Sequence, residues 1–141
     1  MNSMFAGLFN TSFKKITFED MQTIIKNKEK YIVINTLPLN EQNCLIWNTI
    51  NYDMEEKIIN DLLNQYNFKD KSIIVYGKNA NDHTAEKKYR QLITIGFVDV
   101  YIYLGGMFEW MLLQDIYGKD EFPTTTIVLD ILKYKGKREL G

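Results

Sequence analysis

The fold of this chain is restricted most by three short runs of β-branched and aromatic residues. They span Tyr31–Asn35, Ile73–Tyr76 and Val98–Tyr103. The first run has no polar alternation, which is typical of a strand that is covered on both faces. The segments between the runs have helical periodicity, and a crossover through a helix returns the chain to the same edge of the sheet, so neighbouring strands pair in parallel. The pattern therefore predicts an α/β fold around a parallel sheet.

Amphipathic helices are predicted between and around these runs. Each has apolar residues at the helical interval and a recognisable signal at one end. The segment 124–134 stays open, because its β-branched start favours a strand whereas the spacing of Leu129 and Leu132 favours a helix. Four helices are predicted. The first begins at Thr17, and the second begins at Asp53 and covers about Met54–Gln65. The third runs from Asp82 or Thr84 as far as Gly96, and the fourth spans Phe108–Tyr117.

The length of 141 residues and the single cysteine limit how the chain is organised. A chain of this size buries roughly 70% of its unfolded surface, which suffices for one stable domain. Cys44 alone cannot form an intramolecular disulfide, which excludes a disulfide scaffold and a cysteine-rich zinc site and indicates a reducing, cytoplasmic compartment. We expect a flexible N-terminal segment over 1–14 and one domain over 15–141, with a C-terminal extension from about 122.

The charge balance argues against nucleic-acid and membrane partners. The sequence carries 17 basic and 18 acidic residues, for a formal net charge of −1. Its apolar runs are far shorter than the ~20 residues of a spanning helix. The basic tail residues Lys133, Lys135, Lys137 and Arg138 are interpreted as a solvated end. We therefore expect no nucleic-acid and no membrane partner.

A polar loop after the second run is the candidate site. In parallel α/β sheets, ligands gather where strands lead into helix N-termini, whose free amides favour anions. Successive loop amides can form an anion-sized concavity, and Lys78 can add positive charge. The alternative is ordinary turn and capping chemistry, which uses the same Asn and Asp residues. The predicted loop consists of Gly77, Lys78, Asn79, Ala80, Asn81, Asp82, His83 and Thr84.

The run from Ile73 to Trp110 resembles the C-terminal half of a rhodanese-like domain. It has a Val-Tyr strand, a loop, a helix, a Gly-Phe-x-x-Val motif, a short strand and a Gly-Gly-x-x-x-Trp motif. A looser resemblance extends over about Ile16–Tyr117, with YIVIN in place of the family's V-x-I-D and Cys44–Asn51 in place of H-I-P-G-A-I-N. The resemblance implies the rhodanese fold, a five-stranded parallel sheet flanked by helices. The matching residues are Gly96, Phe97, Val100, Leu104, Gly105, Gly106 and Trp110.

The departures from the family concern its chemistry. Active rhodaneses carry a cysteine directly after the Val-Tyr strand, which accepts sulfane sulfur as a persulfide, and an arginine near the end of the loop that holds an anionic substrate. Here the cysteine position is Gly77, which has no side chain to form a thiolate. The loop contains no arginine, since Arg90 lies well into the following helix, and Asn35 replaces the aspartate of V-x-I-D. The resemblance thus implies a scaffold without its nucleophile or its anion clamp.

The resemblance and its departures imply a protein that is inactive as a sulfurtransferase and binds a small anion or a protein partner in a regulatory role. It needs no cofactor and no metal. The alternative is a sulfurtransferase that uses Cys44 as a relocated nucleophile, although a cysteine between apolar residues is more often a buried small hydrophobe. A phosphatase related to the fold is disfavoured, because it also needs the missing loop cysteine and arginine.

Three further residues have a functional and a plain interpretation. His83 is the only histidine and titrates near neutral pH, which suits a general base, but the plainer interpretation is an exposed loop histidine. Trp110 lies among apolar residues at helical spacing and is expected in the core. Trp47 and its neighbours are expected either to form an apolar partner surface or to be buried under the edge of the sheet.

Overall fold

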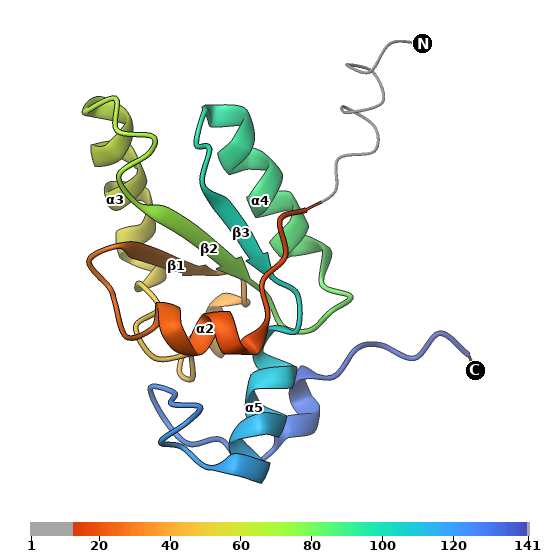
Figure 1. Cartoon of the computed structure of the whole chain (residues 1–141). Helices are drawn as coiled ribbons and strands as arrows, with labels where there is room; N and C mark the ends of the chain where they lie inside the picture. Colours follow the sequence, from red (N-terminus) through yellow and green to blue (C-terminus); the bar gives the residue numbers. More distant parts are fainter. Residues whose placement is uncertain (1–12, 141) are drawn as a thin grey trace.

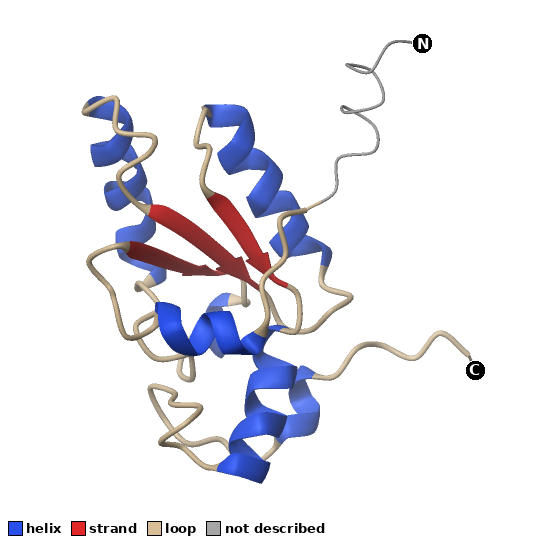
Figure 2. Cartoon of the chain, viewed as in Figure 1, coloured by secondary structure: helices blue, strands red, loops and turns tan. Residues whose placement is uncertain are grey.

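The computed structural model describes residues 13–140 and contains a parallel sheet with helices on both faces (Figure 1). Figure 2 shows the sheet, in the order β1-β2-β3, enclosed by helical layers. The α/β class is therefore confirmed. The strands are β1 (Tyr31–Asn35), β2 (Ser72–Tyr76) and β3 (Val100–Tyr103). The helices are α2 (Phe18–Ile24), α3 (Tyr52–Asn64), α4 (His83–Ile95) and α5 (Gly106–Tyr117), with short 3₁₀ helices η1 (Leu39–Glu41) and η2 (Ile131–Tyr134).

The strands form where the β-branched runs predicted them, and every strand residue after the first is buried in β1 and β2. Both pairs are parallel, with Ile32 beside Ile73 and Ile73 beside Val100. The third strand is shorter than its predicted run, because Val98 and Asp99 belong to the turn that precedes it. The central position of β2 places the loop that follows it in the middle of the sheet's carboxyl edge.

The expectation of a five-stranded sheet is wrong for the described residues, which form three strands. Single parallel bridges flank the sheet instead, between Lys15 and Ile102 at one edge and between Val33 and Thr49 at the other. Each outer segment has too little room for a strand. At one edge Thr17 already caps α2, and at the other α3 begins at Tyr52.

Alternating strand side chains form two apolar cores on opposite faces of the sheet. One core packs β-strand residues against α2, α5 and η2, and it contains Trp110, which is fully buried as predicted. The other core packs strand residues against α3 and α4. The first core includes Met21, Val33, Ile74, Tyr76, Tyr103, Trp110 and Tyr134, and the second includes Ile32, Ile34, Ile59, Val75, Leu92 and Ile102.

The helix starts agree with the sequence in two cases and differ in two, since α5 begins at Gly106 instead of at the predicted Phe108. Thr17 caps α2 through a reciprocal capping box with Asp20, as its position in the sequence predicted. Asp82 caps α4 by accepting a hydrogen bond from the Thr84 amide. The cap predicted at Asp53 is wrong, because α3 begins at Tyr52 after Asn51, and Asp53 lies within its first turn. No helix among residues 13–140 is both long and apolar enough to cross a membrane.

The N-terminal end of the described chain packs onto the domain, whereas residues 137–140 at the other end are exposed. Residues 1–12, most of the expected flexible segment, lie outside the described residues. The ring of Phe13 packs edge-on against Tyr89 with centroids 5.1 Å apart, and the carbonyl of Lys14 accepts a hydrogen bond from Ile102 N at 2.8 Å. Segment 124–134 forms neither a regular strand nor an α-helix, since Thr124 makes one antiparallel bridge to Ile46 before η2.

Candidate functional site at the carboxyl edge of the sheet

The loop Gly77–Thr84 joins the end of β2 to the start of α4 at the carboxyl edge of the sheet (Figure 1). This edge is where ligands collect in parallel α/β folds. The structure therefore brings the predicted loop residues together at one end of the central strand.

The carboxylate of Asp82 occupies the inside of this loop. Its Oδ2 accepts a hydrogen bond from Lys78 N at 2.7 Å, and its Oδ1 accepts from Thr84 N at 3.0 Å and from Thr84 Oγ1 at 2.6 Å. A Cβ atom placed on Gly77 would lie 2.5 Å from Asp82 Oδ2 and 3.0 Å from Thr36 Oγ1. The carboxylate thus fills the space in which a side chain at position 77 would begin.

The asparagines of the loop are also engaged within the chain. Asn79 Oδ1 accepts a hydrogen bond from Asn81 N at 2.9 Å, and Asn79 Nδ2 donates one to the carbonyl of Tyr134 at 2.9 Å. The Asp82 amide donates to the carbonyl of Asn79. The amides of Lys78, Asn81, Asp82 and Thr84 are therefore satisfied by groups of the loop itself.

A second turn supports the loop from below. The Met107 and Phe108 amides at the start of α5 donate to the carbonyls of Gly77 and Lys78 at 3.0 and 2.9 Å. Gly106 precedes them with a φ of +63°, and a Cβ there would lie 2.5 Å from the carbonyl oxygen of Gly77. Only glycine permits this close approach, so the Gly-Gly motif fixes the loop backbone onto α5.

The charge of Lys78 points away from the centre of the loop. Its Nζ forms an ion pair with Glu41 Oε2 at 2.9 Å, and both side chains are largely buried. Glu41 is the last residue of η1, a segment that no sequence pattern connected with the site. Lys78 therefore neutralises a carboxylate of the chain instead of offering its charge to a ligand.

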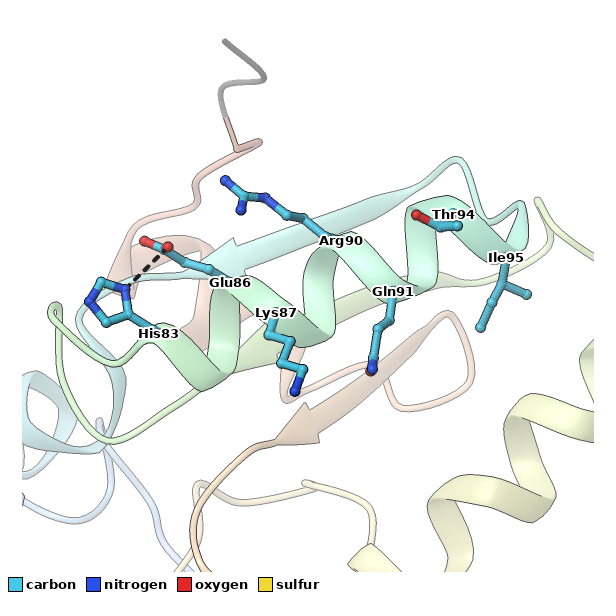
Figure 3. Close-up of a pocket in the computed structure, with 7 residues that line it drawn as sticks. All are labelled: His83, Glu86, Lys87, Arg90, Gln91, Thr94 and Ile95. Atoms are coloured by element: carbon cyan, nitrogen blue, oxygen red, sulfur yellow. Dashed lines mark ion pairs between the residues drawn. The ribbon is translucent and has the colours of Figure 1, made fainter. Parts of the chain in front are cut away.

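His83 is the first residue of α4 and faces solvent. Its side chain is 90% exposed, and Nδ1 lies 3.5 Å from Glu86 Oε2 on the next turn. Figure 3 shows it at one end of a shallow hollow that runs along the outer face of α4, with Arg90 and Thr94 further along. The Asp82 carboxylate is bound to Lys78 and Thr84, so the two adjacent residues do not form an acid–base pair.

Cys44 lies in the core below the loop. The residue is fully buried, and its Sγ donates a weak hydrogen bond to the carbonyl of Thr126 at 3.5 Å. The residues on either side, Leu45 and Ile46, are buried as well. The thiol has no path to solvent in this arrangement. Residues 13–140 contain no group of three or more His, Cys, Asp and Glu side chains suited to a metal ion.

A buried tyrosine is the last residue of each strand that leads into these two turns, Tyr76 in β2 and Tyr103 in β3. Tyr76 Oη lies 2.8 Å from Thr49 Oγ1 and accepts a hydrogen bond from Ile46 N. Tyr103 Oη donates to Glu109 Oε1 at 2.6 Å. Burial raises the pKa of both phenols above the ordinary value of 10, and the Glu109 carboxylate raises the pKa of Tyr103 further.

Comparisons with known proteins identify the family to which this scaffold belongs. The rhodanese-like domain family matches residues 18–113, and the chain belongs to that family. No curated protein sequence matches the chain. The matched residues include the loop Gly77–Thr84, which contains neither cysteine nor arginine.

Solved structures of low identity share the fold. A full-length protein from Lactobacillus plantarum is 20% identical, with 90% of this chain and 100% of that chain covered and a TM-score of 0.59. A yeast protein tyrosine phosphatase of the Rhodanese family is 13% identical, with 84% and 95% covered and a TM-score of 0.57. An As-Sb reductase from Leishmania major is 20% identical, with 75% and 79% covered and a TM-score of 0.53. These likenesses confirm the rhodanese fold.

Proposed function

We propose that this rhodanese-like domain is a binding module that engages a protein partner through the loop Gly77–Thr84 and transfers no sulfur. The observation that carries the proposal is the Asp82 carboxylate, which lies against Gly77 and takes the amides of Lys78 and Thr84. A carboxylate cannot carry a sulfane sulfur. Its negative charge also repels thiosulfate and other anions from the place where the loop amides converge.

The same observation favours a partner over a small anion. An anion at the loop must displace Asp82 from three hydrogen bonds, whose donors are Lys78 N, Thr84 N and Thr84 Oγ1. The positive charge of Lys78 is already paired with Glu41. A partner that presents hydrogen-bond donors or positive charge meets a preformed carboxylate instead, so we infer a protein surface of that character as the ligand.

A sulfurtransferase that uses Cys44 is the rival function. It requires the thiol to meet a substrate, yet Cys44 is fully buried beneath the segment that contains Thr126. A phosphatase mechanism lacks the loop cysteine and arginine, since the Arg90 guanidinium lies 5.1 Å from the centre of the Phe13 ring, on the outer side of α4. Both rivals therefore need rearrangements that the proposed binding role does not.

The experiment combines a sulfur-transfer assay with an anion titration. We expect the wild-type protein and the Cys44→Ser variant to transfer sulfur from thiosulfate to cyanide no faster than buffer. Turnover in the wild type that Cys44→Ser abolishes overturns the proposal and establishes the rival.

The titration follows the amide signals of Lys78 and Thr84 with millimolar thiosulfate or phosphate. We expect no shift in the wild type, and a saturable shift in Asp82→Asn, which keeps an oxygen acceptor but removes the charge. Saturable binding to the wild type identifies a small anion as the ligand and contradicts the choice of a protein partner. A photo-crosslinking residue at the exposed position Asn81, with one at Lys119 as the matched control, then shows whether a partner contacts the loop.

A further inference from the structure

The C-terminal residues Ile127–Gly136, called the strap from here on, pack against α5 and reach back to the loop (Figure 1). The chain before the strap is anchored by hydrogen bonds to the Cys44 segment, from Thr125 N to Leu45 O and from Thr126 Oγ1 to Asn43 O, both at 2.8 Å. Beyond Thr126, one hydrogen bond joins the strap to the rest of the described domain, from Asn79 Nδ2 to the carbonyl of Tyr134.

Tyr134 is the latch of the strap. Its side chain is fully buried in the core that contains Cys44, whereas Leu129 and Leu132 on the same strap are 91% and 63% exposed. Val128 and Ile131 add partly buried contacts to that core. The strap is therefore held chiefly by a single large side chain near its end.

The surroundings of the Tyr134 side chain contain buried polar atoms without hydrogen-bond partners. Tyr134 Oη and Glu41 Oε1 are both buried and have no hydrogen-bond partner. Burial raises the pKa of Tyr134, and the Cys44 and Glu41 groups near its phenol raise it further. An orphaned buried hydroxyl lowers the stability of the closed strap, because the hydroxyl regains water when the strap opens.

We propose that the strap opens locally, without unfolding of the sheet, and that its opening turns Cys44 into a modification site for small disulfides. In the open state the Cys44 thiol loses its proton to solvent, and the resulting thiolate attacks one sulfur of the disulfide. The disulfide bond breaks, a mixed disulfide forms on Cys44, and the other half leaves as a thiolate. The inference does not depend on the proposed function, since it concerns thiol access alone.

The experiment measures labelling of the full chain by 5,5′-dithiobis(2-nitrobenzoate) as urea is raised towards the global unfolding transition. Cys44 is the only cysteine, so the released thionitrobenzoate reports a single site. We expect the labelling rate at low urea to depend on urea much more weakly than global unfolding does, because a local opening exposes little surface. A rate that follows the slope of global unfolding at every urea concentration overturns the proposal.

A pair of substitutions at the latch tests its role. Tyr134→Phe removes only the orphaned hydroxyl and is expected to slow labelling about fivefold. Tyr134→Ala is expected to accelerate labelling by at least about a hundredfold, beyond any change that its urea midpoint explains. Leu132→Ala is the matched control on the exposed side of the strap and is expected to stay within about twofold of the wild type. If Tyr134→Ala does not fold, the urea dependence of labelling and the Tyr134→Phe variant still test the proposal. A labelling rate of Tyr134→Phe equal to or above that of the wild type contradicts the role of Tyr134 in holding the strap.

Discussion

Two turns lie side by side at the carboxyl edge of this sheet and have opposite relations to the family pattern. The turn after β3 keeps the family's Gly-Gly motif, and Gly106 there adopts a backbone conformation that only glycine accepts easily. The loop after β2 contains neither cysteine nor arginine, and its backbone is arranged around the Asp82 carboxylate. The first turn is constrained by backbone geometry, whereas the second is held by hydrogen bonds to a side-chain carboxylate.

This difference teaches that the shape of the loop does not depend on its chemistry. The carbonyls of Gly77 and Lys78 cap α5, so the loop backbone has a structural role whichever side chains it carries. The internal carboxylate of Asp82 satisfies the amides of Lys78 and Thr84. The backbone contacts to α5 and the side-chain contacts of Asp82 therefore stabilise the loop separately.

The largest effect is expected from a change in the turn that keeps the family motif. Gly106→Ala places a Cβ 2.5 Å from the carbonyl oxygen of Gly77 and forces alanine into a φ of +63°. We expect a loss of at least about 3 kcal/mol in the free energy of unfolding, because both atoms in the clash are held by backbone. Urea denaturation of Gly106→Ala and of the wild type measures this difference in the free energy of unfolding.

Gly105→Ala is the matched control for that change. Its φ is −58°, which alanine adopts without strain, but its added Cβ meets the side chain of Glu109, including its Cβ at 2.8 Å and the carboxylate that accepts the Tyr103 hydrogen bond. We expect a cost of about 2 kcal/mol, because the side chain of Glu109 must shift but the backbone is not strained. Equal costs for the two variants would show that the contact with Gly77 is not what constrains the turn.

An intermediate effect is expected in the loop, where Gly77 and Asp82 compete for one space. Gly77→Cys adds a side chain that pushes against the Asp82 carboxylate, and Asp82→Ala removes the cap of α4; we expect each to cost about 2 kcal/mol. The double variant is expected to cost at least about 1 kcal/mol less than the sum, because the added side chain then finds the space empty. Strict additivity in urea denaturation contradicts the shared space.

The smallest effect at neutral pH concerns the tyrosines that precede the two turns. The folded-state pKa of Tyr76 and that of Tyr103 lie above the ordinary value of 10, so the folded protein holds these protons longer than the unfolded chain does. Their contribution to stability is fully present below pH 10 and is lost as the pH rises above 10.

Each tyrosine is expected to add about 1.4 kcal/mol per pH unit to that alkaline loss. Tyr103→Phe and Tyr76→Phe should each reduce the slope of unfolding free energy against pH by that amount. Tyr66→Phe, at an 85% exposed position, is the control that leaves the slope unchanged. Identical slopes in all variants contradict the assignment.

Much of the fold followed from local patterns in the sequence. The strand over Tyr31–Asn35 and the helix cap at Thr17 depend on neighbouring residues, and both were predicted correctly. The predicted five-stranded sheet was wrong, because the outer segments turn into α2 and α3 after single bridges. Local patterns do not record how much of a segment its neighbours leave free for pairing.

The sequence predicted the position of the candidate site but not the contacts within it. The loop and the cap at Asp82 were predicted, whereas the insertion of its carboxylate beside Gly77 depends on the packing of Gly106 beneath the loop. The ion pair of Lys78 with Glu41 and the burial of Tyr134 near Cys44 join residues far apart in the chain. No spacing rule signals such contacts in a single sequence.

The single bridges at the two sides of the sheet also limit how a partner can approach. Ile50 N donates to the carbonyl of Val33, and Ile102 exchanges hydrogen bonds with Lys14 and Ile16, so both outer strands have part of their main chain occupied. Free outer strands are the usual template for strand addition and for aggregation. Here intermolecular β-pairing must first displace segments of the same chain, so the proposed partner is expected to contact loops and helices instead of extending the sheet.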